Sequence, residues 1–223
     1  MSMGMGGGAA PAGARDVRSW RLVALMAVAG AVAGLLIVTA YQVTLPKIQH
    51  HQGEVMQAAV LEVLKGPASF DTLYLHDGAL VKALPPGTDP KGVEKIFLGR
   101  DARGTPVGFA LSAVENGFQD PVTVMHGYDA ATRKVVAMRV IANRETPGLG
   151  DKIVKDTAFV HGFEGAAVPL VGVKPDRGKS GPGDVVMITG ATISSRAVIR
   201  IINNAVARWQ PLMDAYRDGE VQP

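Results

Sequence analysis

A long run without any charged side chain, from Leu22 to Tyr41, restricts this chain more than any other feature of its sequence. The run begins directly after Arg21. In a helix, about 20 residues at roughly 1.5 Å each extend about 30 Å, which is the thickness of the hydrocarbon core of a bilayer. The sequence therefore predicts a transmembrane helix over 22–41.

A secretory signal peptide is the alternative interpretation of this run, because Val38-Thr39-Ala40 resembles a small-residue cleavage site. The apolar core of a signal peptide is usually about 7–15 residues long, so the length of the run favours a retained anchor. Three arginines precede the run (Arg15, Arg18 and Arg21), whereas Lys47 alone follows it closely. The positive-inside rule then predicts a cytoplasmic N-terminus, with the rest of the chain outside the cytoplasmic membrane.

Changes in composition divide the rest of the chain. The N-terminus is rich in Gly, Met and Ala, and we expect it to be disordered. An amphipathic stretch follows the predicted span, and Gly66-Pro67 should end it. The expected segments are a cytoplasmic N-terminus (1–21), the transmembrane helix (22–41), a linker helix (42–66), one extracytoplasmic domain (67–215) and a tail (216–223).

Short apolar runs separated by turn residues fill the predicted domain. Asp77-Gly78 predicts a tight hairpin between two of them, and a short helix is expected at Lys155–His161. The expected strands cover 72–76, 79–83, 96–99, 107–114, 122–128, 135–141, 168–173 and 185–188. The pattern predicts an α+β fold, in which helices cover one side of a mainly antiparallel sheet.

The composition excludes several classes of site. The chain has no cysteine, which rules out disulfides and iron–sulfur clusters held only by thiolates. Its five histidines form no metal-binding pattern on a helix face, so no metal site is expected. A net charge of +3, without a dense basic patch, gives no reason to expect a nucleic-acid partner. Any redox chemistry must then come from an organic cofactor.

The stretch from Thr189 to Ser195 reads Thr-Gly-Ala-Thr-Ile-Ser-Ser and stands at the start of a predicted amphipathic helix. The apolar residues that recur at helical spacing are Val198, Ile201, Ile202, Ala205 and Val206. We expect Ser194 or Ser195 to cap this helix. Thr192 would then place its hydroxyl beside a helix N-terminus, which favours a phosphate. An ordinary capped helix after a strand is the alternative.

A second motif, from Arg144 to Lys152, reads Arg-Glu-Thr-Pro-Gly-Leu-Gly-Asp-Lys and follows a predicted strand. Pro147 fixes one backbone angle, and Gly148 and Gly150 permit positive φ angles. We therefore expect a rigid, exposed loop. The alternative is an ordinary turn from strand to helix.

Together these motifs resemble those of the FMN-binding subunits of Rnf complexes and of Na+-pumping quinone reductases. That family's pattern is close to Asp-x-x-Ser/Thr-Gly-Ala-Thr. Its last threonine carries FMN through a phosphoester bond, which a flavin transferase forms from FAD. The resemblance makes Thr192 the residue of covalent attachment. The other cofactor-binding residues that it implies are Thr189, Gly190, Ala191, Ser194, Glu145, Thr146, Gly148 and Leu149.

Two positions depart from the family pattern. Val186 stands where the family has its acidic residue, and the nearest acid is Asp184. The family's Gly-aromatic-x-Gly turn begins here as Gly117-Phe118, but Asp120-Pro121 stands where the second glycine is expected. We expect this turn to be stiffer, and Phe118 to be either a packing residue or a ring contact.

The resemblance implies the G-type subunit of an Rnf complex, which is a membrane-anchored electron carrier with covalent FMN. Such complexes connect ferredoxin and NAD and translocate Na+ or H+. The implied partners are the other subunits of the complex, the membrane and, during maturation, the flavin transferase. Three alternatives stay open: the FMN subunit of a Na+-pumping quinone reductase, an FMN subunit of another extracytoplasmic electron-transfer route, and a non-redox membrane-anchored assembly module.

Overall fold

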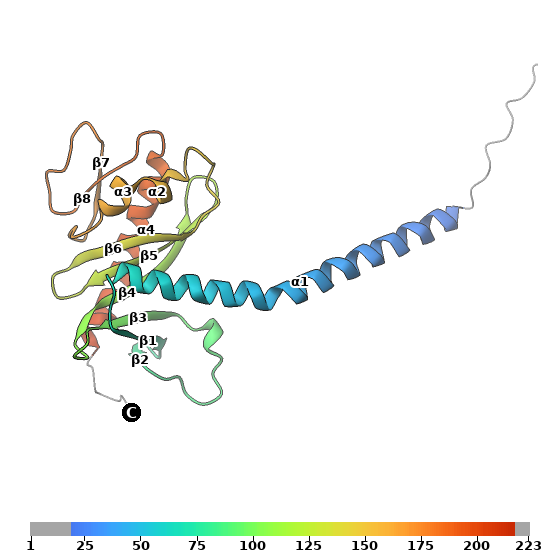
Figure 1. Cartoon of the computed structure of the whole chain (residues 1–223), viewed down its shortest axis with the longest axis horizontal. Helices are drawn as coiled ribbons and strands as arrows, with labels where there is room; N and C mark the ends of the chain where they lie inside the picture. Colours follow the sequence, from blue (N-terminus) through green and yellow to red (C-terminus); the bar gives the residue numbers. More distant parts are fainter. Residues whose placement is uncertain (1–18, 217–223) are drawn as a thin grey trace, which may run out of the picture. The chain divides into compact units, whose positions relative to one another are not determined.

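The computed structural model describes residues 19–216 (Figure 1), so the predicted disordered segment before residue 19, the arginines Arg15 and Arg18, and the tail after residue 216 lie outside the described residues. The chain forms two compact units, Met1–Gln52 and Gly53–Pro223. Each unit is described by itself below.

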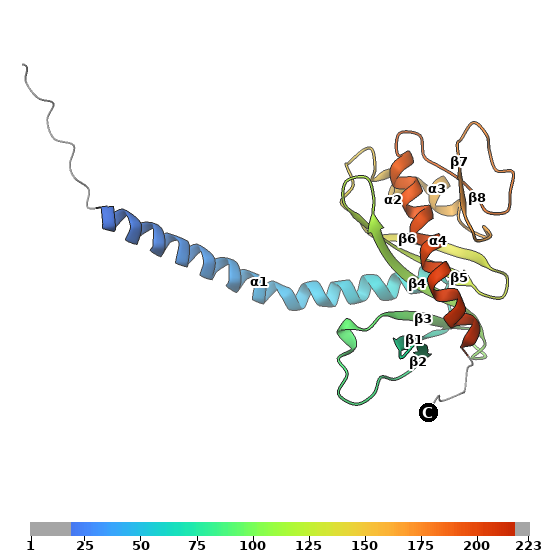
Figure 2. The same ribbon diagram turned by 180° about the vertical axis from the view of Figure 1, so that it is seen from behind.

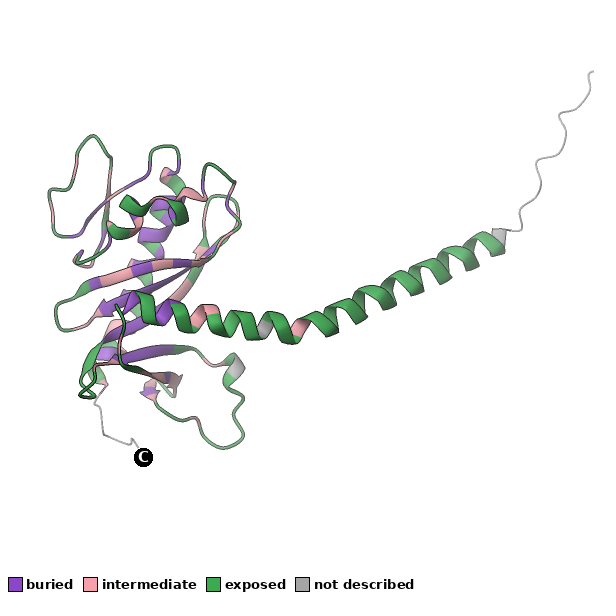
Figure 3. Cartoon of the chain, viewed as in Figure 1, coloured by how far each residue is buried: buried purple, intermediate pink, exposed green. Residues whose placement is uncertain are grey.

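Helix α1 (Ser19–Val63) contains both the predicted span and the predicted linker helix as one continuous helix. Among the described residues it is the one helix that is long and apolar enough to cross a membrane, and the side chains of that apolar stretch are exposed (Figure 3). Pro46 lies within the helix without ending it. The helix ends where predicted: Lys65 and Gly66 have positive φ angles, and the Gly66 N–H donates to the Leu61 carbonyl over 2.8 Å.

A six-stranded antiparallel sheet forms the centre of the second unit, in the order β2-β1-β3-β4-β5-β6. The strands are β1 (Ser69–His76), β2 (Ala79–Val81), β3 (Lys95–Arg100), β4 (Pro106–Asn116), β5 (Pro121–Asp129) and β6 (Lys134–Ala142). A short 3-10 helix η1 (Pro90–Gly92) precedes β3. Asp77 and Gly78 both have positive φ angles, as a two-residue turn between twisted strands requires, so the predicted hairpin is confirmed.

The two faces of this sheet are covered by different helices. Helix α4 (Thr192–Ala215) lies across β4 and β5 on one face (Figure 2). The end of α1 packs on the other face, where Val60 and Val63 meet Met125. Successive side chains of a strand point to opposite faces, so Val124 belongs to the α4 side. The predicted mainly antiparallel α+β fold is confirmed, but helices cover parts of both faces rather than one.

Gly127 allows the end of α1 to approach the sheet. A Cβ atom at this position would lie 2.1 Å from the Val63 carbonyl oxygen, which is far inside van der Waals contact. Only glycine therefore permits this packing. Figure 3 shows the result, with α1 buried only in its last turns.

The chain between β6 and α4 carries the remaining elements. Helices α2 (Lys152–Lys155) and α3 (Thr157–His161) replace the single predicted helix, because Asp156 has an extended backbone and caps α3 by accepting from the Phe159 N–H. Strands β7 (Val171–Val173) and β8 (Asp184–Val186) are shorter than predicted and pair in parallel. This small sheet is the exception to the antiparallel pattern.

Candidate functional site

Helix α4 begins at Thr192, so this hydroxyl lies on the first residue of a long packed helix. The N-cap position is Ala191, which has no side-chain acceptor, and the predicted cap by Ser194 or Ser195 is therefore wrong. Ser195 instead donates to the Ala191 carbonyl over 2.8 Å and accepts from the Ile188 N–H over 3.2 Å. The first N–H groups of α4 thus gain no acceptor from the cap, and they carry the positive end of the helix dipole.

Glu145 joins three segments that are distant in the sequence. Its Oε1 accepts from the backbone N–H groups of Phe118 (2.9 Å) and Gln119 (3.2 Å), in the turn between β4 and β5. Its Oε2 accepts from Ser194 Oγ over 2.8 Å, in the first turn of α4. The side chain is only 4% exposed, and each of these hydrogen bonds to a carboxylate is charge-assisted. The turn, the loop after β6 and the start of α4 are thereby held together.

Two glycines make room for this carboxylate. A Cβ atom at Gly117 would lie 2.3 Å from Glu145 Oε1, and one at Gly150 would lie 2.4 Å from Oε2. Gly150 does not use a positive φ angle, contrary to the expectation from the sequence, whereas Gly148 does (φ 78°). The Gly148 N–H donates to Asp151 Oδ1 over 2.7 Å, which fixes the loop internally.

These contacts leave a pocket of about 340 Å³ beside Thr192, here called the Leu149 pocket. It is lined by Phe118, Thr146, Leu149, Gly150, Gly190, Ala191, Thr192, Ile193 and Ser194. Three of the apolar lining side chains are largely exposed: Phe118 by 64%, Leu149 by 54% and Ile193 by 53%. Exposed apolar groups around a concave surface favour a ligand that is largely apolar.

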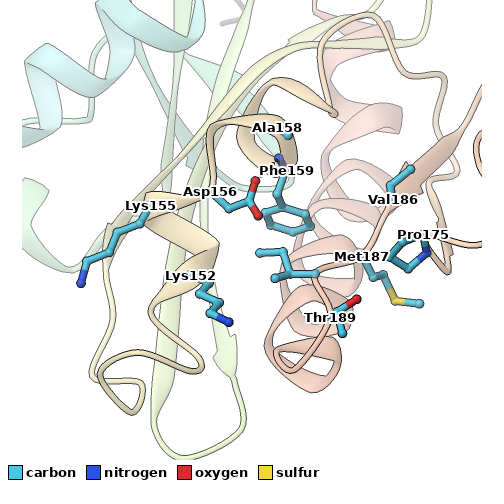
Figure 4. A pocket seen from close by; sticks show the side chains of 10 residues that line it. Lys152, Lys155, Asp156, Ala158, Phe159, Pro175, Val186, Met187 and Thr189 are labelled. Atoms are coloured by element: carbon cyan, nitrogen blue, oxygen red, sulfur yellow. Dashed lines mark hydrogen bonds between the residues drawn. The ribbon is translucent and has the colours of Figure 1, made fainter.

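Two further pockets adjoin the same stretch of chain. One, of about 350 Å³ and here called the Lys174 pocket, is lined by Lys174, Pro175, Asp176, Met187, Ile188, Thr189, Gly190 and Thr192. The other, of about 580 Å³ and here called the Lys152 pocket, has Lys152, Lys155 and Asp156 around an apolar floor that includes Phe159 (Figure 4). Thr192 borders the first of these two as well as the Leu149 pocket, and Thr189 borders both of them.

Most of the site residues predicted from the sequence come together here. Thr192, Gly190, Ala191, Ser194, Thr146 and Leu149 line the Leu149 pocket, and Glu145 lies behind its wall. Thr189 lies on the neighbouring pockets, and Gly148 lines none of the three. The sequence left the role of Phe118 undecided, and it did not identify Ile193, Gly117 or Lys152 as site residues. Ile193 and Lys152 stand within the two motifs, but nothing in either motif indicates that they take part in the site. Separate segments of the chain bring these residues together only when the domain folds.

Asp184 does not replace the acidic residue that Val186 lacks. Its carboxylate accepts from the N–H groups of Ser180 and Gly181, both over 2.8 Å, and these hydrogen bonds lower its pKa. The hydrogen bonds of this side chain therefore stabilise its own loop, and it does not line either pocket that Thr192 borders. Val186 itself lines the Lys152 pocket.

Comparison with known proteins gives consistent results. The model of the FMN-binding domain family matches residues 117–207. Proteins named as the G subunit of the ion-translocating oxidoreductase complex are similar along most of the chain. The relative from Aliivibrio fischeri is 32% identical over 85% of this chain and 88% of its own. The relative from Vibrio atlanticus is 33% identical over 79% and 82%, and that from Methanosarcina acetivorans is 29% identical over 83% and 92%.

Two solved structures share the fold. The crystal structure of Shewanella oneidensis NqrC has a TM-score of 0.58 at 18% identity and covers 74% of this chain and 98% of its own. The structure of the C subunit of the Na+-translocating NADH-quinone reductase from Parabacteroides distasonis has a TM-score of 0.51 at 22% identity, over 68% and 80%. At these identities the likeness shows the fold alone.

Proposed function

The chain belongs to the family of G subunits of ion-translocating oxidoreductase complexes, and from this we propose that it carries FMN covalently on Thr192. It is an FMN-binding electron-transfer subunit of an Rnf complex. We further propose the covalent bond, the orientation in the membrane and a part in ion translocation. The position of Thr192 at the border of two pockets supports the covalent bond most directly.

The residues around Thr192 fit a flavin bound through its phosphate. The volume of the Leu149 pocket, about 340 Å³, lies at the small end of the range for small-molecule sites, about 300–1,000 Å³. Its exposed apolar side chains, Phe118, Leu149 and Ile193, match the apolar character of an isoalloxazine ring. Gly190, with a φ of 83°, brings the backbone to Thr192 without a side chain in the way.

Residues of the chain itself would bind, orient and shield the cofactor. The Thr192 hydroxyl would supply the oxygen of the phosphoester, and Leu149 and Phe118, which line the pocket, would shield the ring from water. The hydroxyl of Thr146, which donates to Gln119 Oε1 over 2.8 Å, ties the 144–152 loop to the turn that carries Phe118. Bound flavin accepts one or two electrons, so it can relay electrons between one-electron carriers and two-electron carriers.

The relay needs neighbouring subunits. The sequence has no cysteine, so the chain holds no thiolate-ligated iron–sulfur cluster of its own. Electrons must therefore arrive from and leave to other subunits of the complex, whose combined activity would translocate Na+ or H+. We place the membrane span at 22–41 and the FMN domain, 67–215, outside the cytoplasm, because the basic residues gather before the span.

We infer that a flavin transferase attaches the cofactor from FAD during maturation. Thr192→Ala tests which residue is linked, because alanine removes the linking oxygen with little change in volume. The wild-type chain, expressed with the transferase, should gain the mass of FMN less water and fluoresce on a denaturing gel. The Thr192→Ala chain should do neither.

Thr189→Ala is the matched control, since it removes a neighbouring hydroxyl that does not form the bond, and it should keep most of the attached flavin. Normal fluorescence of the Thr192→Ala chain would reject the assignment of the linking residue. A wild-type chain without covalent flavin would favour a non-redox assembly module.

A further inference from the structure

Lys152 lies next to the segment that carries Thr192. A Cβ atom on Gly190 would lie 4.0 Å from Lys152 Nζ, and apart from Gly190 and its two chain neighbours no other residue would come within 4 Å of it. Gly190 precedes Thr192 by two residues, so the ammonium group lies beside the backbone that leads to the linking hydroxyl. Figure 4 shows the amine of Lys152 on the side of the pocket that faces the Thr189 segment.

Within residues 19–216, the ammonium of Lys152 forms no hydrogen bond and no ion pair. The side chain is half-buried, and the neighbouring Asp151 carboxylate, which lies close enough to interact with it electrostatically, is already paired with Lys155. A bound anion between Lys152 and Gly190 would supply the missing partner.

The other lysines near Thr192 differ from Lys152. Lys155 is exposed, points away from the pocket in Figure 4, and pairs with Asp151. Its hydrogen bond is the main reason why the pKa of Asp151 is lowered. Lys174 lines the pocket that bears its name together with Thr192, but its side chain is exposed. Of the three lysines, Lys152 is thus the one that is half-buried and forms no hydrogen bond or ion pair within residues 19–216.

We propose that Lys152 binds the flavin phosphate at Thr192, both during attachment and afterwards; this rests on the function proposed above. In the attachment step, a bond forms between Thr192 Oγ and the FMN phosphorus of FAD. The bond from that phosphorus to the bridging oxygen of the pyrophosphate breaks, AMP leaves with that oxygen, and the hydroxyl proton is released. Lys152 neutralises the phosphoryl oxygens during this transfer and then pairs with the anionic phosphodiester.

Rates of attachment test the first half of the proposal. The full-length chain is incubated with FAD and purified transferase, and the gain in intact mass is followed with time. Lys152→Gln should slow attachment by about tenfold, the effect of losing one charge-assisted hydrogen bond to the phosphoryl group. Lys152→Arg should recover most of the rate. Lys155→Gln is the matched control and should stay within about twofold of wild type, and Lys174→Gln tests whether the other lysine beside Thr192 has this role instead.

Chemical labelling of the wild-type chain tests the second half without any variant. Lysines are acetylated in the flavin-free and flavin-bearing chains, and the modified peptides are quantified by mass spectrometry. Attachment should protect Lys152 several-fold and leave Lys155 unchanged. Equal labelling of Lys152 in both forms, or a wild-type rate for Lys152→Gln, would overturn the proposal, as would a slow Lys174→Gln beside a normal Lys152→Gln. If Thr192→Ala still gains flavin, or wild type gains none, the proposed function itself fails instead.

Discussion

Ser194 Oγ donates a hydrogen bond over 2.8 Å to Oε2 of Glu145, a residue 49 positions earlier in the chain. This contact joins the loop after β6 to the first turn of α4. Because Glu145 also accepts from the turn that carries Phe118, one carboxylate determines how the walls of the Leu149 pocket meet. The shape of the pocket therefore depends on a buried group that does not line it.

Gly150→Ala should destabilise the domain by about 1–3 kcal/mol, because its Cβ would lie 2.4 Å from Glu145 Oε2. Chemical denaturation measures the change in the free energy of unfolding. Gly92→Ala is the control, since a Cβ there meets nothing within 4 Å. In a Glu145→Ala background the cost at residue 150 should fall, although Cβ of residue 145, at 2.8 Å, stays close. An equal cost in both backgrounds would show that the carboxylate does not explain the glycine.

Leu149→Ala should reduce the stability that attached flavin adds. The exposed Leu149 side chain would be covered by the ring, so truncating it removes roughly 1 kcal/mol from that increment. The measurement compares the free energies of unfolding of the flavin-free and flavin-bearing chains. Val154→Ala is the matched control, because Val154 is also exposed but lies on α2 outside the pocket. The same increment for Leu149→Ala and wild type would place the ring elsewhere.

Sequence and structure agree best where a feature is local. The hairpin at Asp77-Gly78 and the six strands of the main sheet follow from turn residues and short apolar runs, and each was predicted close to its observed bounds. The end of α1 was predicted for the same reason, since Gly66 adopts the backbone conformation that ends a helix. The sequence signals for these features lie in residues that are close together in the chain.

The differences come from contacts between distant segments. Serine is a residue type that often caps helices, but the Ser194 hydroxyl donates its hydrogen bond to Glu145 instead. Neither motif alone indicates this contact. The sequence suggested that position 150 needs glycine for its backbone freedom. In the structure the reason is the Glu145 carboxylate, which leaves no room for a Cβ atom there. The break at Asp156 that gives two short helices, and the parallel pairing of β7 and β8, likewise depend on tertiary packing.

His126 should make the domain less stable in mild acid. It is fully buried on β5, neither ring nitrogen has a hydrogen-bond partner in the described part of the chain, and burial lowers its pKa to about 3. Its cross-strand neighbours, Leu111 and Met138, are apolar. Below about pH 6.5 the unfolded chain binds a proton that the folded chain does not. The free energy of unfolding should therefore fall by up to about 1.4 kcal/mol per pH unit from pH 6.5 towards 3.

Denaturation of the full chain in detergent between pH 5 and 7.5 measures this slope. His126→Leu should flatten it, because leucine keeps the volume and removes the titrating group. His161→Leu is the control, since His161 is exposed on α3. A slope that survives His126→Leu unchanged would assign the acid sensitivity to other groups.

The domain that carries Thr192 should lie outside the cytoplasm. The basic residues before the span, including Arg21, outnumber the single Lys47 that follows it closely. A reporter that is active only in the cytoplasm, fused after Pro223, should be silent, and a reporter that needs export should be active. The same pair of reporters fused before Met1 should give the reverse result. Cytoplasmic activity of the C-terminal fusion would invert the proposed topology.

The first residue of α4 is a fixed point, because this helix is packed along the sheet through side chains such as Val198, Ile202 and Val206. A cofactor attached to a flexible arm can travel between its reaction partners. One esterified to Thr192 can move only through the rotatable bonds between its phosphate and its ring. Electron donors and acceptors would then have to bring their own redox centres to this place, and the distances between centres would be set when the complex assembles.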